Sequence, residues 1–204
     1  MIAIIDYGVG NLFSLQSSFA MIGQDAVVTG DKRAIADADR LILPGVGAFG
    51  DARKKLADTG LDETLLAQAK SGKMIMGICL GMQMLFNRSF EYGEHTGLSL
   101  IPGEVVDMTP RIRKDLKVPH IGWNALDMIR PEHPLFKYVK SGDCVYFVHS
   151  FFADKCAQNT IATSEYDIPL TAAVARDNVI GCQFHPEKSG HVGLNLLRAF
   201  CEMK

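Results

Sequence analysis

The sequence predicts an α/β fold: a single domain over residues 1–204, with a central, mostly parallel sheet, helices on both faces, and an antiparallel or mixed extension. Two patterns and the length support this prediction. In the first half, short apolar strands alternate with helical patterns, which is typical of a parallel sheet. In the second half, apolar segments follow one another with little helix between them. A chain of 204 residues, 48% of them hydrophobic, is long enough to bury one sizeable core.

The first half contains four strand candidates separated by helical stretches. After the first strand and the loop DYGVG, apolar residues recur at helical spacing from Leu12 to Ile22, and Gly23 offers a stop. Charged helical patterns follow around 32–38 and 49–71. The strand candidates are 2–5, 26–28, 41–43 and 74–78.

The second half contains a series of apolar segments and one terminal helix. Val192, Leu196, Leu197 and Phe200 lie on roughly one side of that helix, so we expect it to pack the C-terminus onto the sheet. The strand candidates are 104–108, 123–128, 144–150, 160–164, 171–177 and 178–184.

Composition and charge limit the class of protein. A formal net charge of -2 supplies no broad electrostatic attraction for nucleic acid. No segment reaches the roughly 18 continuous apolar residues of a membrane span, and the N-terminus has no basic region followed by a long apolar stretch. We therefore expect a soluble cytoplasmic protein that binds neither nucleic acid nor membrane.

The five cysteines suggest neither a disulfide framework nor a metal site. They are odd in number, widely spaced, and contain no C-x-x-C pair. This usage fits a reducing compartment, in which an unpaired thiol behaves as a small buried hydrophobe unless its surroundings activate it. We expect four of the five to be such buried thiols, and we expect no metal and no cofactor.

The fifth cysteine lies in GICLG, residues 77–81, at the end of a strand candidate. Glycines on both sides of Cys79 make room for a sharp strand-to-helix turn, the cysteine version of a nucleophile elbow. A thiol at a helix N-terminus faces unpaired N–H groups and the positive end of the helix dipole, which favour the thiolate. The alternative is a buried cysteine in an ordinary link, where the glycines serve packing alone.

The segment QFHPEKSG, residues 183–190, offers a base for this thiol. Pro186 pushes His185 toward an extended conformation, in which residues two apart point the same way. Glu187 would then lie beside His185, about 6–7 Å along the chain. Cys79, His185 and Glu187 together form a nucleophile, a base and an orienting group. Taken alone, the segment also fits a surface turn.

Acyl transfer needs hydrogen-bond donors for the developing oxyanion. One would be the N–H of Leu80, which follows the nucleophile. The glycine-rich loop in LILPGVGAFG, residues 41–50, could supply another from Val46 or Gly47. A phosphate cradle is the competing interpretation of this loop, but it has neither a G-K-[ST] ending nor G-x-G-x-x-G spacing.

Taken together, PGVGAFG, GICLGMQMLF and QFHPEKSG resemble the motifs of the class I, or triad, glutamine amidotransferases. That family releases ammonia from glutamine through a thioester. Within it, DYGVGNL, PHIGWN and YFVHS resemble the glutaminase subunits of imidazole glycerol phosphate synthases. The resemblance runs from Asp6 to Gly190, which is essentially the whole chain.

The resemblance implies a role for each matching residue. Cys79 would attack the side-chain amide of glutamine, His185 would protonate the departing ammonia and then activate water, and Glu187 would orient His185. The positions implied for holding or flanking the glutamine are Gln83, Glu91, His149 and Ser150.

The resemblance also implies a partner, a (β/α)8-barrel cyclase. Ammonia would pass through it to a ribulosyl aminoimidazole carboxamide, giving imidazole glycerol phosphate for histidine and an aminoimidazole carboxamide ribotide. Asn11, Trp123 and Lys188 resemble positions at that contact, although a lone tryptophan is also a common core residue. Phe151 departs from the tyrosine that the family often has after VHS, which suggests a weaker contact at the rim of the pocket.

Two other functions remain open at this point. The same glutaminase chemistry could supply ammonia to another acceptor, and the chain could be a binding protein with an inactive triad. His95, His133 and His191 show no metal-ligand spacing, so we expect surface or capping roles for them.

Overall fold

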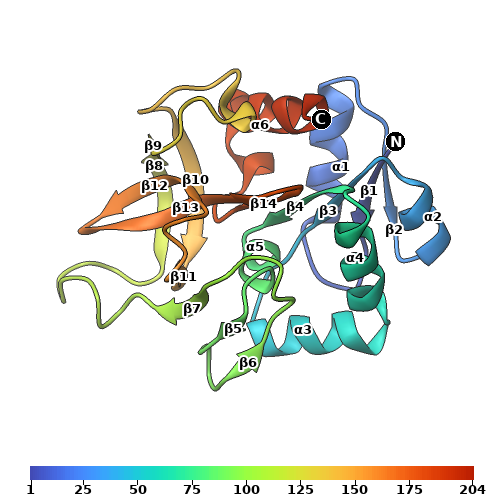
Figure 1. Cartoon of the computed structure of the whole chain (residues 1–204). Coiled ribbons are helices and arrows are strands. Elements are labelled where there is room, and N and C mark those ends of the chain that lie inside the picture. Colours follow the sequence, from blue (N-terminus) through green and yellow to red (C-terminus); the bar gives the residue numbers. More distant parts are fainter.

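The computed structural model describes residues 1–204 and is built around an eight-stranded sheet (Figure 1). Its strands are β1 (Ile2–Ile5), β2 (Ala26–Thr29), β3 (Arg40–Leu43), β4 (Met74–Ile78), β9 (Asp127–Met128), β12 (Thr160–Tyr166), β13 (Ile168–Arg176) and β14 (Val179–Cys182). Their order is β2-β1-β3-β4-β14-β13-β12-β9. The strands from β2 to β14 pair in parallel, and the last three join antiparallel. The predicted parallel sheet with an antiparallel extension is confirmed.

Two smaller sheets complete the β structure. They are formed by β5 (Arg88–Ser89), β6 (His95–Thr96), β7 (Glu104–Asp107), β8 (His120–Ala125), β10 (Cys144–His149) and β11 (Phe151–Asp154). One has the order β11-β7-β5-β6, and the other is the antiparallel pair β10-β8. The predicted strand at 123–128 is thus divided between β8 and β9, with the buried side chain of Leu126 between them.

The helices are α1 (Leu12–Met21), α2 (Lys32–Asp37), α3 (Phe49–Asp58), α4 (Leu61–Lys70), α5 (Leu80–Met84) and α6 (Gly190–Glu202), with two short 3-10 turns, η1 (Pro134–Phe136) and η2 (Pro186–Lys188). The helical pattern at 49–71 is two helices, because Gly60 adopts φ +64° and ends the first one. No helix is long and apolar enough to cross a membrane.

Both faces of the sheet are covered, as the continuous apolar strands predict. Successive residues of β1 point to opposite faces, and all four are buried. Ile4 belongs to a core cluster of 26 residues that includes α1 and α6, whereas Ile5 belongs to another of 26 that includes α2, α3 and α4. Figure 1 shows α1 and α6 together on one side of the sheet and α3 and α4 on the other.

The cysteines are less uniform than the sequence suggested. Cys156 and Cys182 are buried, and Cys201 is half-buried. Cys144 is exposed, so the prediction of four buried thiols was wrong. It begins β10, where its side chain alternates with the buried Val145 and points to solvent.

Candidate active site

The turn from β4 into α5 forms the predicted elbow. Cys79 adopts φ 55° and ψ −112°, a conformation that is strained for any residue with a side chain. Its backbone is held on both sides, because its N–H donates to the carbonyl of Cys182 at 2.8 Å and its carbonyl accepts from the N–H of Gln83. The helix that follows has only five residues, so the stabilisation of the thiolate that was expected from the positive end of its dipole is small.

Close packing explains the two glycines beside Cys79. A Cβ on Gly77 would lie 2.7 Å from the carbonyl oxygen of Gly81, and one on Gly81 would lie 1.9 Å from the carbonyl oxygen of Leu43. The loop after β3 is equally close, since a Cβ on Gly45 would lie 2.7 Å from the nitrogen of Gly81. The elbow and the glycine-rich loop are therefore pressed together by backbone contact.

The base comes from the strand next to β4. The register of β14 with β4 pairs Cys182 with Ile78, so the residues after both strands emerge at the same edge of the sheet. His185 is extended, as its position before Pro186 requires. The Nδ1–H of His185 donates to Oε1 of Glu187 at 2.8 Å. The predicted extended route for Glu187 was wrong: η2 is a 3-10 turn, and this turn brings the carboxylate back to the ring.

The pair is almost completely buried, with side chains 3% exposed for His185 and 1% for Glu187. Burial opposes a charge on His185, but hydrogen bonds and charge interactions with Cys79 and Glu187 outweigh it and raise its pKa to about 9. Oε2 of Glu187 has no hydrogen-bond partner, so the hydrogen bonding of this carboxylate rests on His185. At neutral pH the imidazole carries a proton that it can give to a leaving group.

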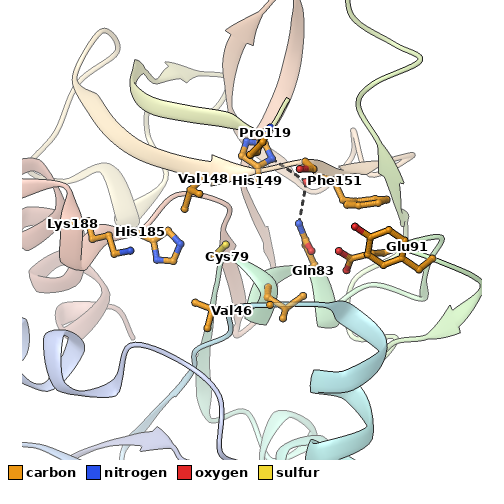
Figure 2. Close-up of a pocket in the computed structure, with 14 residues that line it drawn as sticks. Val46, Cys79, Gln83, Glu91, Pro119, Val148, His149, Phe151, His185 and Lys188 are labelled. Atoms are coloured by element: carbon orange, nitrogen blue, oxygen red, sulfur yellow. Dashed lines mark hydrogen bonds between the residues drawn. The ribbon is translucent and has the colours of Figure 1, made fainter. Parts of the chain in front are cut away.

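A cavity of about 400 Å³ opens above Cys79 (Figure 2). Ten predicted site residues line it: Val46, Gly47, Cys79, Leu80, Gln83, Glu91, His149, Ser150, His185 and Lys188. Phe151, which was expected at the rim of the pocket, also lines it, and the sequence analysis missed three more residues, Tyr92, Pro119 and Val148. Figure 2 shows His185 on one side of Cys79 and Gln83 and Glu91 on the other.

Glu91 is held at the end of the cavity by its surroundings. Its Oε2 accepts from the backbone N–H of Phe49, the first residue of α3, at 2.6 Å. Burial raises the pKa of the Glu91 carboxyl, while that hydrogen bond acts in the opposite direction. The ring of His95 contacts the backbone carbonyl of Glu91 at 3.0 Å and packs against Phe49. His95 therefore has partners in this wall, which the sequence did not suggest, whereas His133 caps η1 as expected.

His149 is one of two histidines in contact. Its Nδ1 lies 2.9 Å from the carbonyl oxygen of Phe151, so this nitrogen must be the donor. Burial lowers the pKa of His149 to about 4, and the neutral ring then accepts at Nε2 from Nδ1–H of His120 at 3.1 Å. His120 is stacked between the rings of Phe147 and Tyr166. The motifs PHIGWN and YFVHS thus supply two histidines to one bonded pair that the sequence analysis did not connect.

Gln183 is another residue that the sequence analysis missed. It is fully buried, and its Nε2 donates to the sulfur of Cys79 at 3.6 Å. Gln83 donates from its Nε2 to Oε1 of Gln183 and to the carbonyl oxygen of Phe151, both at 3.0 Å. A polar residue at the end of an apolar strand was the available signal for Gln183. The contact with Phe151 uses its backbone, so the missing tyrosine hydroxyl does not affect it.

Of the predicted interface residues, Lys188 lines the cavity, whereas Asn11 and Trp123 lie outside it. Trp123 is 57% exposed, which excludes a core role for this residue. Its ring packs edge-on against the ring of Tyr146. The ammonium group of Lys188 lies over the Tyr146 ring, 5.8 Å from its centroid. We call Trp123, Tyr146 and Lys188 the aromatic surface. Asn11 precedes α1, which contacts η2, the turn that carries Lys188.

The comparisons with known proteins agree with this geometry. The family model described as "Glutamine amidotransferase class-I" matches residues 3–203. A protein of Syntrophotalea carbinolica named "Imidazole glycerol phosphate synthase subunit HisH" is 48% identical, with 100% of each chain covered. A protein of Caldanaerobacter subterraneus with the same name is 47% identical, over 100% of this chain and 98% of the relative.

The solved structures show the fold alone, because their sequence identity is low. "Crystal structure of glutamine amidotransferase" has a TM-score of 0.77 at 18% identity, covering 99% of this chain and 98% of the other. Both the family model and the relatives cover essentially the full length. The chain belongs to the class I glutamine amidotransferases, in the branch formed by the imidazole glycerol phosphate synthase subunits HisH.

Proposed function

We propose that this chain, as one amidotransferase domain of residues 1–204, hydrolyses glutamine to glutamate and ammonia and passes the ammonia to a cyclase subunit. The cyclase would use it to convert a ribulosyl aminoimidazole carboxamide into imidazole glycerol phosphate and an aminoimidazole carboxamide ribotide. The observation that carries the proposal is Cys79 on a strained elbow, beside a buried His185 that is hydrogen-bonded to Glu187. The names of the full-length relatives support the choice of pathway.

In the first half-reaction, the sulfur of Cys79 attacks the side-chain carbonyl carbon of glutamine. The developing oxyanion would be met by the N–H of Leu80 and by an N–H of Val46 or Gly47, which line the same cavity. When the tetrahedral intermediate collapses, the C–N bond breaks and His185 gives its proton to the nitrogen. Ammonia leaves, and a thioester remains on Cys79.

In the second half-reaction, neutral His185 takes a proton from water as the water attacks the thioester. The C–S bond breaks, its electron pair returns to sulfur, and glutamate is released. Glu187 holds the ring through Nδ1 in both halves, so that Nε2 is the nitrogen that exchanges the proton.

Binding of the amino-acid end of glutamine is assigned to the far side of the cavity. The α-ammonium group would meet Oε1 of Glu91, whose other oxygen is held by Phe49. Both N–H groups of the Gln83 amide are used internally, so this residue offers its Oε1 to the same ammonium group. His149 and Ser150 close the wall beside the substrate.

The aromatic surface fits the proposed cyclase contact. A large exposed tryptophan that packs against a tyrosine is typical of the anchoring residues of protein interfaces. Lys188 belongs to both this surface and the cavity lining. A cyclase that binds here would therefore border the chamber in which ammonia is released.

The test is glutamate release from glutamine by the purified chain, alone and with a histidine-pathway cyclase and its ribulosyl substrate. We expect strong stimulation by the loaded cyclase and loss of activity in Cys79→Ala. Activity that ignores the cyclase would point to another ammonia acceptor. An absence of activity under every condition would favour a binding protein with an inactive triad.

A further inference from the structure

We propose that Gln183 is a further catalytic residue, whose side-chain amide N–H holds the attacking sulfur of Cys79, and that a chain of buried hydrogen bonds fixes its orientation. The inference rests on the proposed role of Cys79 as the nucleophile. Gln183 is outside the lining of the cavity, so it approaches the sulfur from behind and leaves the substrate side open.

The backbone places Gln183 beside the elbow. Its own N–H donates to the carbonyl of Ala172 on β13 at 2.8 Å, and the preceding residue, Cys182, accepts from the N–H of Cys79 at 2.8 Å. The two side chains therefore start from neighbouring, hydrogen-bonded positions of the sheet. Since Gln183 is fully buried, its amide must form its hydrogen bonds with protein groups and not with solvent.

Chemical logic fixes which end of the amide faces the sulfur. The carbonyl oxygen of Phe151 can only accept, so the group of Gln83 that lies 3.0 Å from it must be the NH2 group. The second N–H of that group points at Gln183, which must therefore present its oxygen, at 3.0 Å. The NH2 group of Gln183 is left facing Cys79, 3.6 Å from the sulfur.

The same carbonyl ties this chain to the pair of histidines. Phe151 also accepts from His149, which accepts from His120. His120 in turn lies 3.4 Å from the side-chain amide of Asn124, on the strand β8 that carries the exposed Trp123. Gln183, Gln83 and the two histidines thus form what we call the sulfur-holding chain. Its histidines and Gln83 are positioning residues, because they reach the sulfur only through Gln183.

The reaction needs such a donor at two points. Before attack, the N–H stabilises the thiolate, for which the five-residue α5 provides little dipole. When water opens the thioester, the electron pair returns to sulfur, and the donor is already in place to receive the charge. Gln183 does not titrate, so it can serve both steps at any working pH.

The experiment is the pH dependence of alkylation of Cys79 by iodoacetamide in the purified chain, followed on its own peptide by mass spectrometry because other thiols also react. The titratable groups that interact with Cys79 are His185, Tyr7 and Cys182. Burial raises the pKa of Tyr7 and that of Cys182 well above their usual values, so His185, with its pKa of about 9, is the neighbour whose protonation affects the alkylation profile.

We expect Gln183→Met, which keeps the length and removes the donor, to move the half-maximal pH upward by about one unit, a roughly tenfold slower reaction at pH 7. Gln183→Glu, which points an acceptor at the sulfur, should move it at least as far. The control is Ser164→Ala, which removes one hydrogen bond of a buried side chain, to Ala125, away from the site, whereas Gln183→Met removes the bond to Cys79 and the bond from Gln83. Its profile should equal that of the unaltered chain.

Coupling between the members of the sulfur-holding chain gives a second, independent test of the proposal. Gln83→Met should shift the profile in the same direction, and combining it with Gln183→Met should add nothing to the single Gln183 variant. Additive shifts, or a Gln183→Met profile equal to that of Ser164→Ala, would overturn the proposal. In glutaminase assays with the cyclase, Gln183→Met should lower kcat at least tenfold with KM for glutamine within about twofold. Alkylation requires neither glutamine nor cyclase, so its outcome is separate from the test of the proposed function.

Discussion

Adding one methyl group at Gly81 should damage activity much more than stability. The Cβ of Gly81→Ala would lie 1.9 Å from the carbonyl oxygen of Leu43, which is about 1.5 Å short of an ordinary contact of 3.4 Å. That oxygen belongs to β3, which is paired with β4, so α5 must move instead. The displaced helix begins directly after Cys79, and a misplacement of about 1 Å at a reacting atom costs roughly 100-fold in rate. Overpacking of this kind costs about 1–3 kcal/mol in unfolding free energy.

The assay pairs glutamate release, measured with the cyclase, with thermal unfolding followed by circular dichroism. We expect kcat/KM to fall at least 100-fold and Tm to fall by roughly 2–4 °C for each kcal/mol lost. Gly72→Ala is the control: it has φ +89° and no atom within 4 Å of the added Cβ, so it loses about 1 kcal/mol to backbone strain and keeps its activity. Near-normal kcat/KM in Gly81→Ala would refute the argument that the elbow is held in place by backbone contact.

Three further predictions concern the charge on His185, the binding of glutamine and the contact with the cyclase. Glu187→Gln should lower kcat about 100-fold or more, because the imidazolium loses its carboxylate. The pKa of His185 is about 9 in the folded chain and about 6.5 in the unfolded chain, so protonation of His185 stabilises the fold by up to about 3 kcal/mol. This stabilisation is complete below pH 6.5 and is lost as the pH rises through 9. Urea unfolding should show a larger gap between the unaltered chain and Glu187→Gln at pH 6 than at pH 9.5, and equal gaps would contradict this. Glu91→Gln keeps an oxygen that accepts from the N–H of Phe49 but loses the negative charge. Initial-rate kinetics should therefore show KM for glutamine raised about tenfold with kcat little changed. An unchanged KM would show that Glu91 is not part of the glutamine-binding site. Trp123→Ala should change the unfolding free energy by less than about 1 kcal/mol, since the side chain is 57% exposed, yet raise the cyclase concentration for half-maximal activation about 30-fold. Activation at the usual concentration would place Trp123 outside the interface.

The sequence was sufficient where a short motif carries its own chemistry. The elbow around Cys79 needs glycines at two fixed positions, and His185 reaches Glu187 within a single turn. Such local constraints can be recognised in the amino-acid sequence. The parallel half of the sheet was equally accessible, because strands buried on both faces are continuous apolar runs.

The rest depends on which distant segments become neighbours. Gln183 meets Cys79 only because β14 lies beside β4, and no local pattern states that pairing. The contact between His120 and His149 depends in the same way on the pairing of β8 with β10. The break at Gly60 was missed for a different reason: apolar spacing on either side of a single glycine is compatible with one helix or with two.

The position of β14 between β4 and β13 also determines when the site can exist. Cys79 and Gln183 are 104 positions apart, so a ribosome completes the elbow long before it synthesises the strand that brings the base. Until β14 is inserted, β4 has an open edge and the sheet is in two parts. The strand that joins the two parts of the sheet also leads directly into His185 and Glu187, so the sheet and the triad depend on the same strand. A chain that ends before β14 therefore has the thiol of Cys79 without its base.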